Sequence, residues 1–224
     1  MVTVIIPAYN ASKYIDECLA SLKDAGQILV GVDACQNTYS HLKNTSGIEL
    51  FYFPKSVGPF AIKNTLIDEA KYDKILFFDA DDVLAEGVIN KIDKLLDEVD
   101  VVKLNYINFQ NKPTTNGHMM YDALMAINKN AFNNLKGFYT WRCGADTELH
   151  HRIAYNKLKT KLLDGLGYHR RLHGENLTMR KDTGHGSSIR NSYVNIIARN
   201  QASGHWPNPE DKIKEQYDKD TTTP

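Results

Sequence analysis

Three aspartates follow a short apolar run near the middle of the chain. Residues 75–78 read Ile-Leu-Phe-Phe, and Asp79, Asp81 and Asp82 come directly after them. An unbroken apolar run of this length predicts a strand buried on both faces, whose carboxyl end is where open α/β sheets bind ligands. Clustered carboxylates repel one another and are costly to dehydrate. A plain acidic turn capping the next helix is one interpretation; the position after a buried strand favours a bound Mg²⁺ or Mn²⁺ ion.

Two further carboxylates stand where elements begin or end. Asp33 closes an apolar run over residues 28–32, so a parallel sheet would bring it to the same edge as Asp79. There it could accept hydrogen bonds from a nucleobase or ribose, or simply cap its own turn. Asp146 opens a helical pattern over residues 146–157. The helix dipole stabilises an acid in that position, and a general base held at a cleft edge would need the same charged form.

A polar cluster late in the chain offers ligands of another kind. His169 and His173 flank Arg170 and Arg171. Imidazole binds transition metals and guanidinium groups suit phosphate, although a loop histidine is often merely solvated. The neighbouring pair at residues 150–151 points about 100° apart on a helix and makes a poor chelating pair.

The elements that must position these groups alternate along the first half. Strands are predicted at 2–6, 28–32, 49–53 and 74–78, and helices from Ile15 to a stop at Gly26, over 60–70 and over 86–99. This order predicts an α/β fold in three layers with a mostly parallel central sheet. The second half is more mixed, with strands predicted at 101–109, 124–127 and 162–163 and helices at 129–135 and 146–157.

Composition narrows the class of protein. The 27 basic and 27 acidic residues cancel, so no global field draws the chain to nucleic acid or to an anionic membrane. Cys18, Cys35 and Cys143 are odd in number and widely spaced, which indicates free thiols in a reducing compartment. No window approaches the roughly 18 to 20 apolar residues of a membrane span, and no secretory signal is visible, so we expect a cytoplasmic protein without a transmembrane segment.

Several motifs are absent from the sequence. It contains no phosphate-binding loop, no dinucleotide fingerprint after a strand, no H-E-x-x-H and no nucleophile elbow. Phosphate-loop nucleotide hydrolysis, dinucleotide redox chemistry and serine hydrolysis therefore lack their usual sequence support.

Taken together, the motifs resemble those of family 2 glycosyltransferases, inverting enzymes with the nucleotide-diphospho-sugar transferase (GT-A) fold. Residues 2–10 (VTVIIPAYN) resemble the family's opening, and residues 77–82 (FFDADD) its metal-binding D-x-D. Asp33, Gly58 with residues 63–64, the D-x-x-L-x-x-R of 146–152 and the segment 168–173 extend the likeness to about residue 178. Where the family often has a second acid, Ala34 follows Asp33 and Ala145 precedes Asp146.

The resemblance implies a role for each matching residue. Asp33 would contact the uracil or ribose, Asp79 the ribose or a metal-bound water, and Pro7, Tyr9 and Asn64 would also lie against the donor. Asp81 would hold Mn²⁺ or Mg²⁺ against the diphosphate, with His173 as a second ligand. Asp146 would be the catalytic base.

The expected protein is a metal-dependent inverting glycosyltransferase with a nucleotide-diphosphate sugar donor, a uridine one above all. Residues 1–205 would form one catalytic domain, with a nucleotide-sugar-binding half (1–100), an acceptor-binding half (101–205) and a polar tail at 206–224. Polysaccharide, lipid-linked sugar, protein and nucleic acid all stay open as acceptors. The alternatives are an inactive nucleotide-sugar-binding module and a sugar-nucleotide pyrophosphorylase, which would need a Gly-rich basic loop after the first strand. Trp206 would anchor the C-terminus or stack on a sugar, and we expect the anchor.

Overall fold

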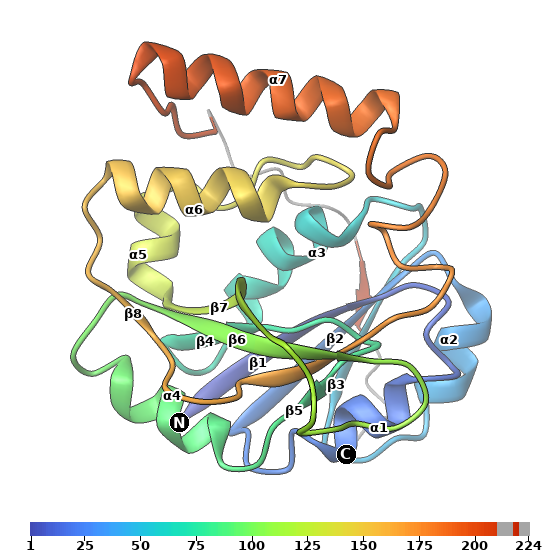
Figure 1. Ribbon diagram of the computed structural model, residues 1–224. Helices are drawn as coiled ribbons and strands as arrows, with labels where there is room; N and C mark the ends of the chain where they lie inside the picture. The colour runs from blue at the N-terminus through green and yellow to red at the C-terminus, as the bar shows by residue number, and fades with distance from the viewer. Residues whose placement is uncertain (210–216, 220–224) are drawn as a thin grey trace.

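One mixed β-sheet forms the middle layer of the protein (Figure 1). The computed structural model describes residues 1–209 and 217–219, apart from the side chains of residues 121–123. Within these residues the strand order is β10-β3-β2-β1-β4-β7-β6-β9-β5, and β8 pairs with β6. The strands are β1 (Val2–Ala8), β2 (Gln27–Asp33), β3 (Glu49–Phe53), β4 (Lys74–Phe77), β5 (Val83–Leu84), β6 (Val101–Phe109), β7 (Met119–Asn128), β8 (Thr160–Leu162), β9 (Tyr168–Arg171) and β10 (Asp218–Lys219).

Helices cover both faces of the sheet, which confirms the three-layer α/β prediction. Alternate residues of a strand point to opposite faces, and β1 accordingly places Val4 and Ile6 in one apolar core and Ile5 in the other. The first core contains α1 (Ile15–Ala20), α2 (Gln36–Leu42) and α4 (Val88–Leu95); the second contains α3 (Pro59–Leu66), α5 (Lys129–Asn134) and α6 (Ala145–Tyr155). The short 3₁₀ helix η1 (Ile67–Glu69) continues α3, and α7 (Ser188–Ser203) lies over α6 on the side away from the sheet (Figure 1).

Parallel pairing is concentrated where the ligand edge was expected. The neighbours β3, β2, β1 and β4 are parallel, whereas β7 pairs antiparallel with both β4 and β6. The ends of β1, β2 and β4 therefore meet at one edge. Close packing of α3 on β2 requires Gly31, since a Cβ there would lie 2.4 Å from Cγ2 of Ile62.

Several elements differ from those predicted from sequence, and the short strands β5 and β9 were not predicted at all. The helix after β1 ends at Ala20 instead of near Gly26, and β7 is longer than the predicted strand at 124–127. Sequence reasoning missed α2 and α7, because α2 buries only Thr38 and Leu42 and α7 buries no residue, which leaves no clear apolar stripe.

Two residues of the predicted polar tail belong to the sheet. Asp218 and Lys219 form β10, which pairs antiparallel with β3, and Tyr217 packs against the rings of Phe51 and Phe53. Two residues are too few for a periodic pattern to reveal a strand. Trp206 is the expected anchor, with its ring stacked 4.4 Å from that of His151. Residues 210–216 and 220–224 of the predicted tail lie outside the described residues.

Candidate active site at the carboxyl edge of the sheet

The parallel strands bring the predicted donor-binding residues to one edge. Pro7 pairs with Gly31 near the end of β1, and Tyr9 just beyond is 57% exposed. Ala34 follows β2 with a φ of 50°, a left-handed conformation that costs about 1 kcal/mol in a residue with a Cβ. Such strain is most often found at ligand sites and switch regions. The carboxyl edge of the sheet is thus formed by irregular backbone that follows the ends of regular strands.

Asp33 shapes this edge through the loop that precedes α3. One of its carboxylate oxygens accepts a hydrogen bond from the amide of Val57 at 2.7 Å. The other accepts from the hydroxyl of Ser56 and the amide of Gly58, both at 3.1 Å. Asp33 is nearly buried and caps a neighbouring loop instead of its own turn. Its predicted contact with a nucleobase or ribose stays a prediction.

Asp79 is paired with Lys63, which belongs to the family likeness at residues 63–64 but received no role there. The ammonium of Lys63 lies 3.2 Å from Oδ1 of Asp79, and Lys63 is only 5% exposed. A lysine so deeply buried requires an ionic partner. The sequence signal for this pair is Lys63 itself, a cationic residue in a helix that also buries Phe60, Ile62 and Leu66. The carboxylate of Asp79 is itself about half exposed and faces the edge.

Asn64 does not fit the predicted contact with the donor. It is fully buried, and its amide exchanges two hydrogen bonds with the backbone of Phe138, at 2.8 and 2.9 Å. The side chain fastens α3 to the segment that leads toward α6. We therefore assign Asn64 a positioning role.

Asp81 and His173, predicted as a pair of metal ligands, lie side by side. Nε2 of His173 is 2.8 Å from Oδ2 of Asp81, and the amide of Asn176 donates to the same oxygen at 2.9 Å. The backbone amide of Glu175 donates to Nδ1 of His173, so the imidazole proton belongs on Nε2. Asn176 was missed; its three-residue spacing from His173 allows it to accept from that residue's amide, at 2.7 Å.

Asp82 points inward and connects β4 with β9. Its Oδ1 accepts a hydrogen bond from the amide of Arg171 at 2.9 Å, and the residue is 4% exposed. Burial, then the charges of Asp81 and Asp79, raises the pKa of the Asp82 carboxyl well above its usual value. Asp82 thus holds β9, the strand that leads to His173, in position. Of the two aspartates, Asp81 is the one that contacts His173.

A row of stacked groups supports His173 from the side. The Tyr14 ring stacks on the imidazole with centroids 4.7 Å apart. The guanidinium of Arg171 lies 4.9 Å from the Tyr14 ring and 4.4 Å from the Phe109 ring. Arg171 also donates to the Asp81 carbonyl at 2.9 Å and pairs with Glu17. Four elements far apart in sequence therefore meet around this imidazole.

Asp146 stands at the start of α6, as predicted. Gly144, with a φ of 78°, provides the left-handed residue before the helix. Asp146 is partly exposed, and no described side chain donates a hydrogen bond to its carboxylate. The helix is held in place by a buried pair, since both oxygens of Glu148 accept from Nε of Arg152 at 2.7 and 2.8 Å. Arg152 also donates to the carbonyls of Leu135 and Gly137.

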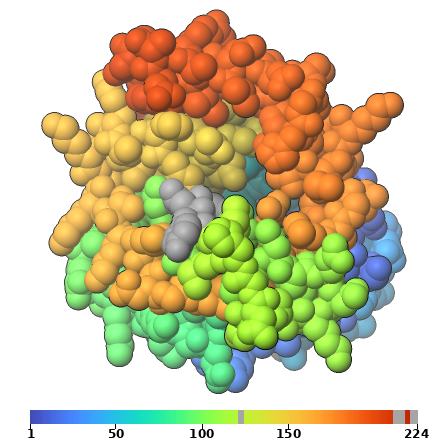
Figure 2. Space-filling model, viewed as in Figure 1, coloured from blue at the N-terminus to red at the C-terminus, as the bar shows by residue number. Residues whose placement is uncertain are grey.

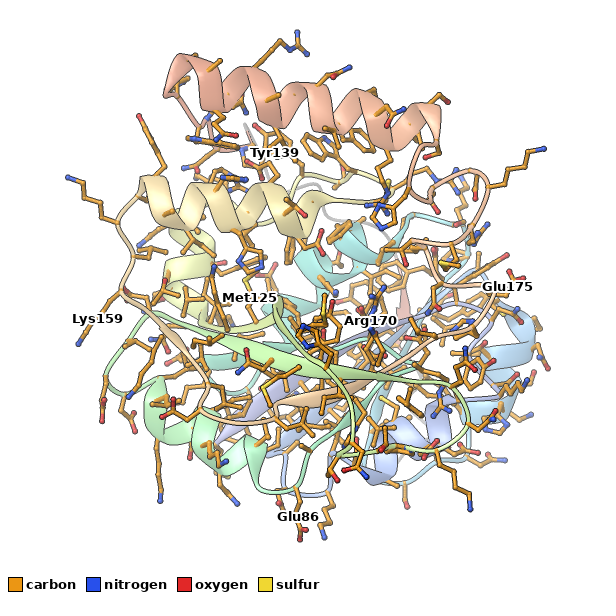
Figure 3. All side chains as sticks on the ribbon, in the orientation of Figure 1. Glu86, Met125, Tyr139, Lys159, Arg170 and Glu175 are labelled. Atoms are coloured by element: carbon orange, nitrogen blue, oxygen red, sulfur yellow. The ribbon has the colours of Figure 1, made fainter. Side chains whose placement is uncertain are left out.

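A hollow lies between α6 and the segment that follows β9 (Figure 2). Figure 2 shows it bounded by α6 in yellow, the segment after β9 in orange and the β6–β7 connection in green, with teal atoms of α3 visible at depth. Arg170 lies at the centre of this view in Figure 3, where Tyr139 lies between α6 and α7. The Arg170 guanidinium donates to Thr178 at 2.9 Å and lies 5.7 Å from the Tyr106 ring. The remaining histidine of the predicted cluster, His169, packs edge-on against Phe109.

The fold is similar to that of TarS, a protein with several solved structures. Solved structures of S. aureus TarS 1-349 superpose with a TM-score of 0.62 in the complex with UDP (18% identity, covering 78% of this chain and 61% of that one). The complex with UDP-GlcNAc gives a TM-score of 0.63 (17% identity, 77% and 58% coverage). The fold is accordingly the nucleotide-diphospho-sugar transferase (GT-A) fold.

The chain belongs to the family "Glycosyl transferase family 2", which matches residues 3–164. An "Uncharacterized glycosyltransferase" of Haemophilus influenzae is 28% identical over 100 residues, which cover 41% of this chain and 40% of the relative. "Glycosyltransferase GlyG" of Streptococcus pneumoniae serotype 4 is 28% identical over 120 residues, 49% of this chain and 40% of that protein. The chain thus aligns with about two-fifths of the length of these curated relatives. Among the described residues, no helix combines the length and apolar character that a membrane span requires.

Proposed function

We propose that this protein is a metal-dependent inverting glycosyltransferase that transfers a sugar from a UDP-linked donor to a hydroxyl group of an acceptor. The observation that carries the proposal is the meeting of Asp81 and His173 at 2.8 Å, beside Asp79, at the carboxyl edge of a GT-A sheet. Family membership supports sugar transfer and leaves the pyrophosphorylase alternative without support.

The donor atoms at this edge fit Mn²⁺ or Mg²⁺. A carboxylate and an imidazole that converge on one point, both partly exposed, suit a borderline-hard divalent ion such as Mn²⁺. No cluster of three His, Cys, Asp or Glu side chains able to hold a metal occurs among the described residues. Asp81 and His173 would hold the ion with two protein groups; for Nε2 to be the ligand, its proton would have to move to Nδ1, and the Glu175 amide would give up its hydrogen bond to that nitrogen. When bound, the ion would supply charge neutralisation for the departing diphosphate.

The first turn of α6 supplies the residue that would perform the proton transfer. Asp146 would accept the proton of the acceptor hydroxyl as that oxygen bonds to the anomeric carbon. The bond from this carbon to the diphosphate breaks on the opposite face, and its electron pair leaves with UDP. One displacement of this kind inverts the anomeric configuration. The place of Asp146 in the first turn of a helix supports the assignment, because the helix dipole favours the charged form that a base requires.

The donor assignment rests on family membership and on fold likeness to TarS, whose structures were solved with UDP and UDP-GlcNAc. A calorimetric and thermal-shift screen of UDP-GlcNAc, UDP-glucose, UDP-galactose and GDP-mannose, each with and without Mn²⁺, tests it. We expect a Mn²⁺-dependent UDP-sugar to stabilise the fold by about 2.7 kcal/mol at 100 times its dissociation constant. No metal-dependent binding of any nucleotide sugar would refute the proposal.

The inactive-module alternative makes a different prediction. Such a module would bind the UDP-sugar with Mn²⁺ but release no UDP, either by slow hydrolysis or with an acceptor. An enzyme would release UDP, and proton NMR of the product would show the inverted anomer. Glycans, lipid-linked sugars, peptides and nucleic acids form the acceptor panel for that assay.

A further inference from the structure

Helix α7 is attached to the molecule by a few specific contacts. None of its sixteen residues is buried, and Ile189, Tyr193, Ile196 and Ile197 are only partly covered. Arg190 and Tyr193 are three positions apart and therefore lie on the same face of the helix. Each of them contacts a different side of the hollow.

Tyr193 holds the segment that leads into the proposed base. Its ring stacks on Trp141 with centroids 4.5 Å apart and an interplanar angle of 3°. The Trp141 ring also stacks on Tyr139, at 5.1 Å. The guanidinium of Arg152 on α6 lies 5.4 Å from the Tyr139 ring. Three rings thus connect α7 with the segment before α6, and Arg152 connects that segment with α6 itself.

Arg190 holds the segment that follows the proposed metal ligand. Its Nε donates to the carbonyl of Thr183 at 2.7 Å, and the Thr183 hydroxyl donates to the carbonyl of Leu177 at 2.9 Å. This segment begins with Asn176, whose amide contacts Asp81. The guanidinium fork therefore fixes the turns that carry the support of the Asp81–His173 pair.

Cys143 lies on the segment between Trp141 and Asp146 and is buried. Burial raises the pKa of its thiol, the charge of Arg190 acts in the opposite direction, and the charge of Asp146 acts with burial. The reactivity of this thiol therefore reports on the packing of the segment that leads into α6.

We infer that Tyr193 and Arg190 are positioning residues that set the separation between Asp146 and the Asp81–His173 pair. The inference rests on the proposed function, which assigns those three residues to the reaction. Neither Tyr193 nor Arg190 needs to touch the substrates. Loss of the Tyr193 contact would leave the donor-binding edge intact and shift α6, whereas loss of the Arg190 contact would also loosen the turn that begins with Asn176.

Tyr193→Ala tests the inference, with turnover measured as UDP release from UDP-GlcNAc or from the donor that the screen identifies. We expect kcat to fall about 10- to 100-fold, as a misplacement of about 1 Å can cause, with the dissociation constant of the donor and Mn²⁺ within about twofold of wild type. Tyr193→Phe keeps the stacked ring and should restore turnover. Val194→Ala changes an exposed neighbour on the same helix and should have no effect.

A second readout is independent of activity. Cys143 is 1% exposed, so its alkylation, followed by mass spectrometry of the native protein, should accelerate in Tyr193→Ala but not in Tyr193→Phe. If Tyr193→Ala fails to fold, Arg190→Lys, which keeps the charge but loses the fork, should lower kcat and, because it loosens the turn that begins with Asn176, also weaken Mn²⁺ binding. Unchanged turnover in both variants, or equal losses in Val194→Ala, would overturn the inference. A wild-type protein that binds no nucleotide sugar with Mn²⁺ would instead refute the proposed function.

Discussion

Nε2 of His173 lies 2.8 Å from the carboxylate of Asp81, although 92 positions separate the two residues. The hydrogen bond from the Arg171 amide to Asp82 explains this approach, because it fixes the backbone two residues before His173 against the end of β4. One aspartate of the acidic cluster thus positions the partner of another.

Asp81→Asn should weaken Mn²⁺ binding, because the substitution removes the charge that the proposed site offers. Loss of a mere outer-shell partner costs up to about 100-fold in metal affinity, and a direct ligand should cost at least that. Calorimetry with Mn²⁺ in the presence of UDP measures the change. Asp24→Asn, an exposed acid in the turn after α1, is the matched control. Equal Mn²⁺ affinity in Asp81→Asn and wild type would remove Asp81 from the metal site.

Asp146→Asn should abolish turnover while preserving donor binding. The amide keeps the shape of the side chain but cannot take a proton, and removal of a well-placed base costs about 10² to 10⁴ in rate. UDP release and calorimetric donor affinity are measured on the same preparation. Asp164→Asn alters another exposed acid and should behave as wild type. Near wild-type turnover in Asp146→Asn would show that the base lies elsewhere.

Tyr14→Ala should lower the affinity for Mn²⁺ by loosening His173. An aromatic stack contributes about 0.5 to 1.5 kcal/mol beyond the area it buries, which corresponds to roughly 2- to 12-fold in affinity. Tyr14→Phe retains the ring at 4.7 Å from the imidazole and should bind Mn²⁺ normally. The dissociation constant for Mn²⁺ in the presence of UDP is measured for both variants. An equal loss of Mn²⁺ affinity in Tyr14→Phe and Tyr14→Ala would contradict a role for stacking.

Glu49 should make folding stability depend on pH in the acid range. Burial alone would raise the pKa of this carboxyl, but hydrogen bonds from Lys71, Gln27 and Lys219 prevail and lower it to about 2 from 4.5. A lowered folded-state pKa stabilises the fold above pH 4.5, and this contribution is lost as pH falls toward 2. Because the side chain is one-quarter exposed, we discount the effect for solvent screening to about 1 kcal/mol.

Urea unfolding at pH 7, 4, 3 and 2 measures this contribution. Glu49→Gln should be less stable at pH 7 and should lose less stability than wild type on acidification. Glu86→Gln, at an exposed position that projects from the surface in Figure 3, provides the control. Parallel pH profiles for wild type and Glu49→Gln would argue against the hydrogen-bonded carboxylate and its link to β10.

The sequence alone determined the layered fold and the edge at which the acids gather. Buried parallel strands produce unbroken apolar runs, and the residue after each run must fall at the strand's carboxyl end, so Asp33 and Asp79 could be placed without coordinates. The same local reasoning put Asp146 at a helix start. These conclusions hold because they depend on periodicity and on neighbours close in the chain.

Tertiary structure decided which groups contact one another. The partnership of Lys63 with Asp79, the burial of Asn64 against Phe138, and the attachment of α7 through Tyr193 all join residues that are distant in sequence. A side chain's environment depends on the elements that pack around it, and two residues of β10 or a helix without a buried face carry no periodic signal. Distances across the hollow therefore follow from packing, and local sequence patterns do not encode them.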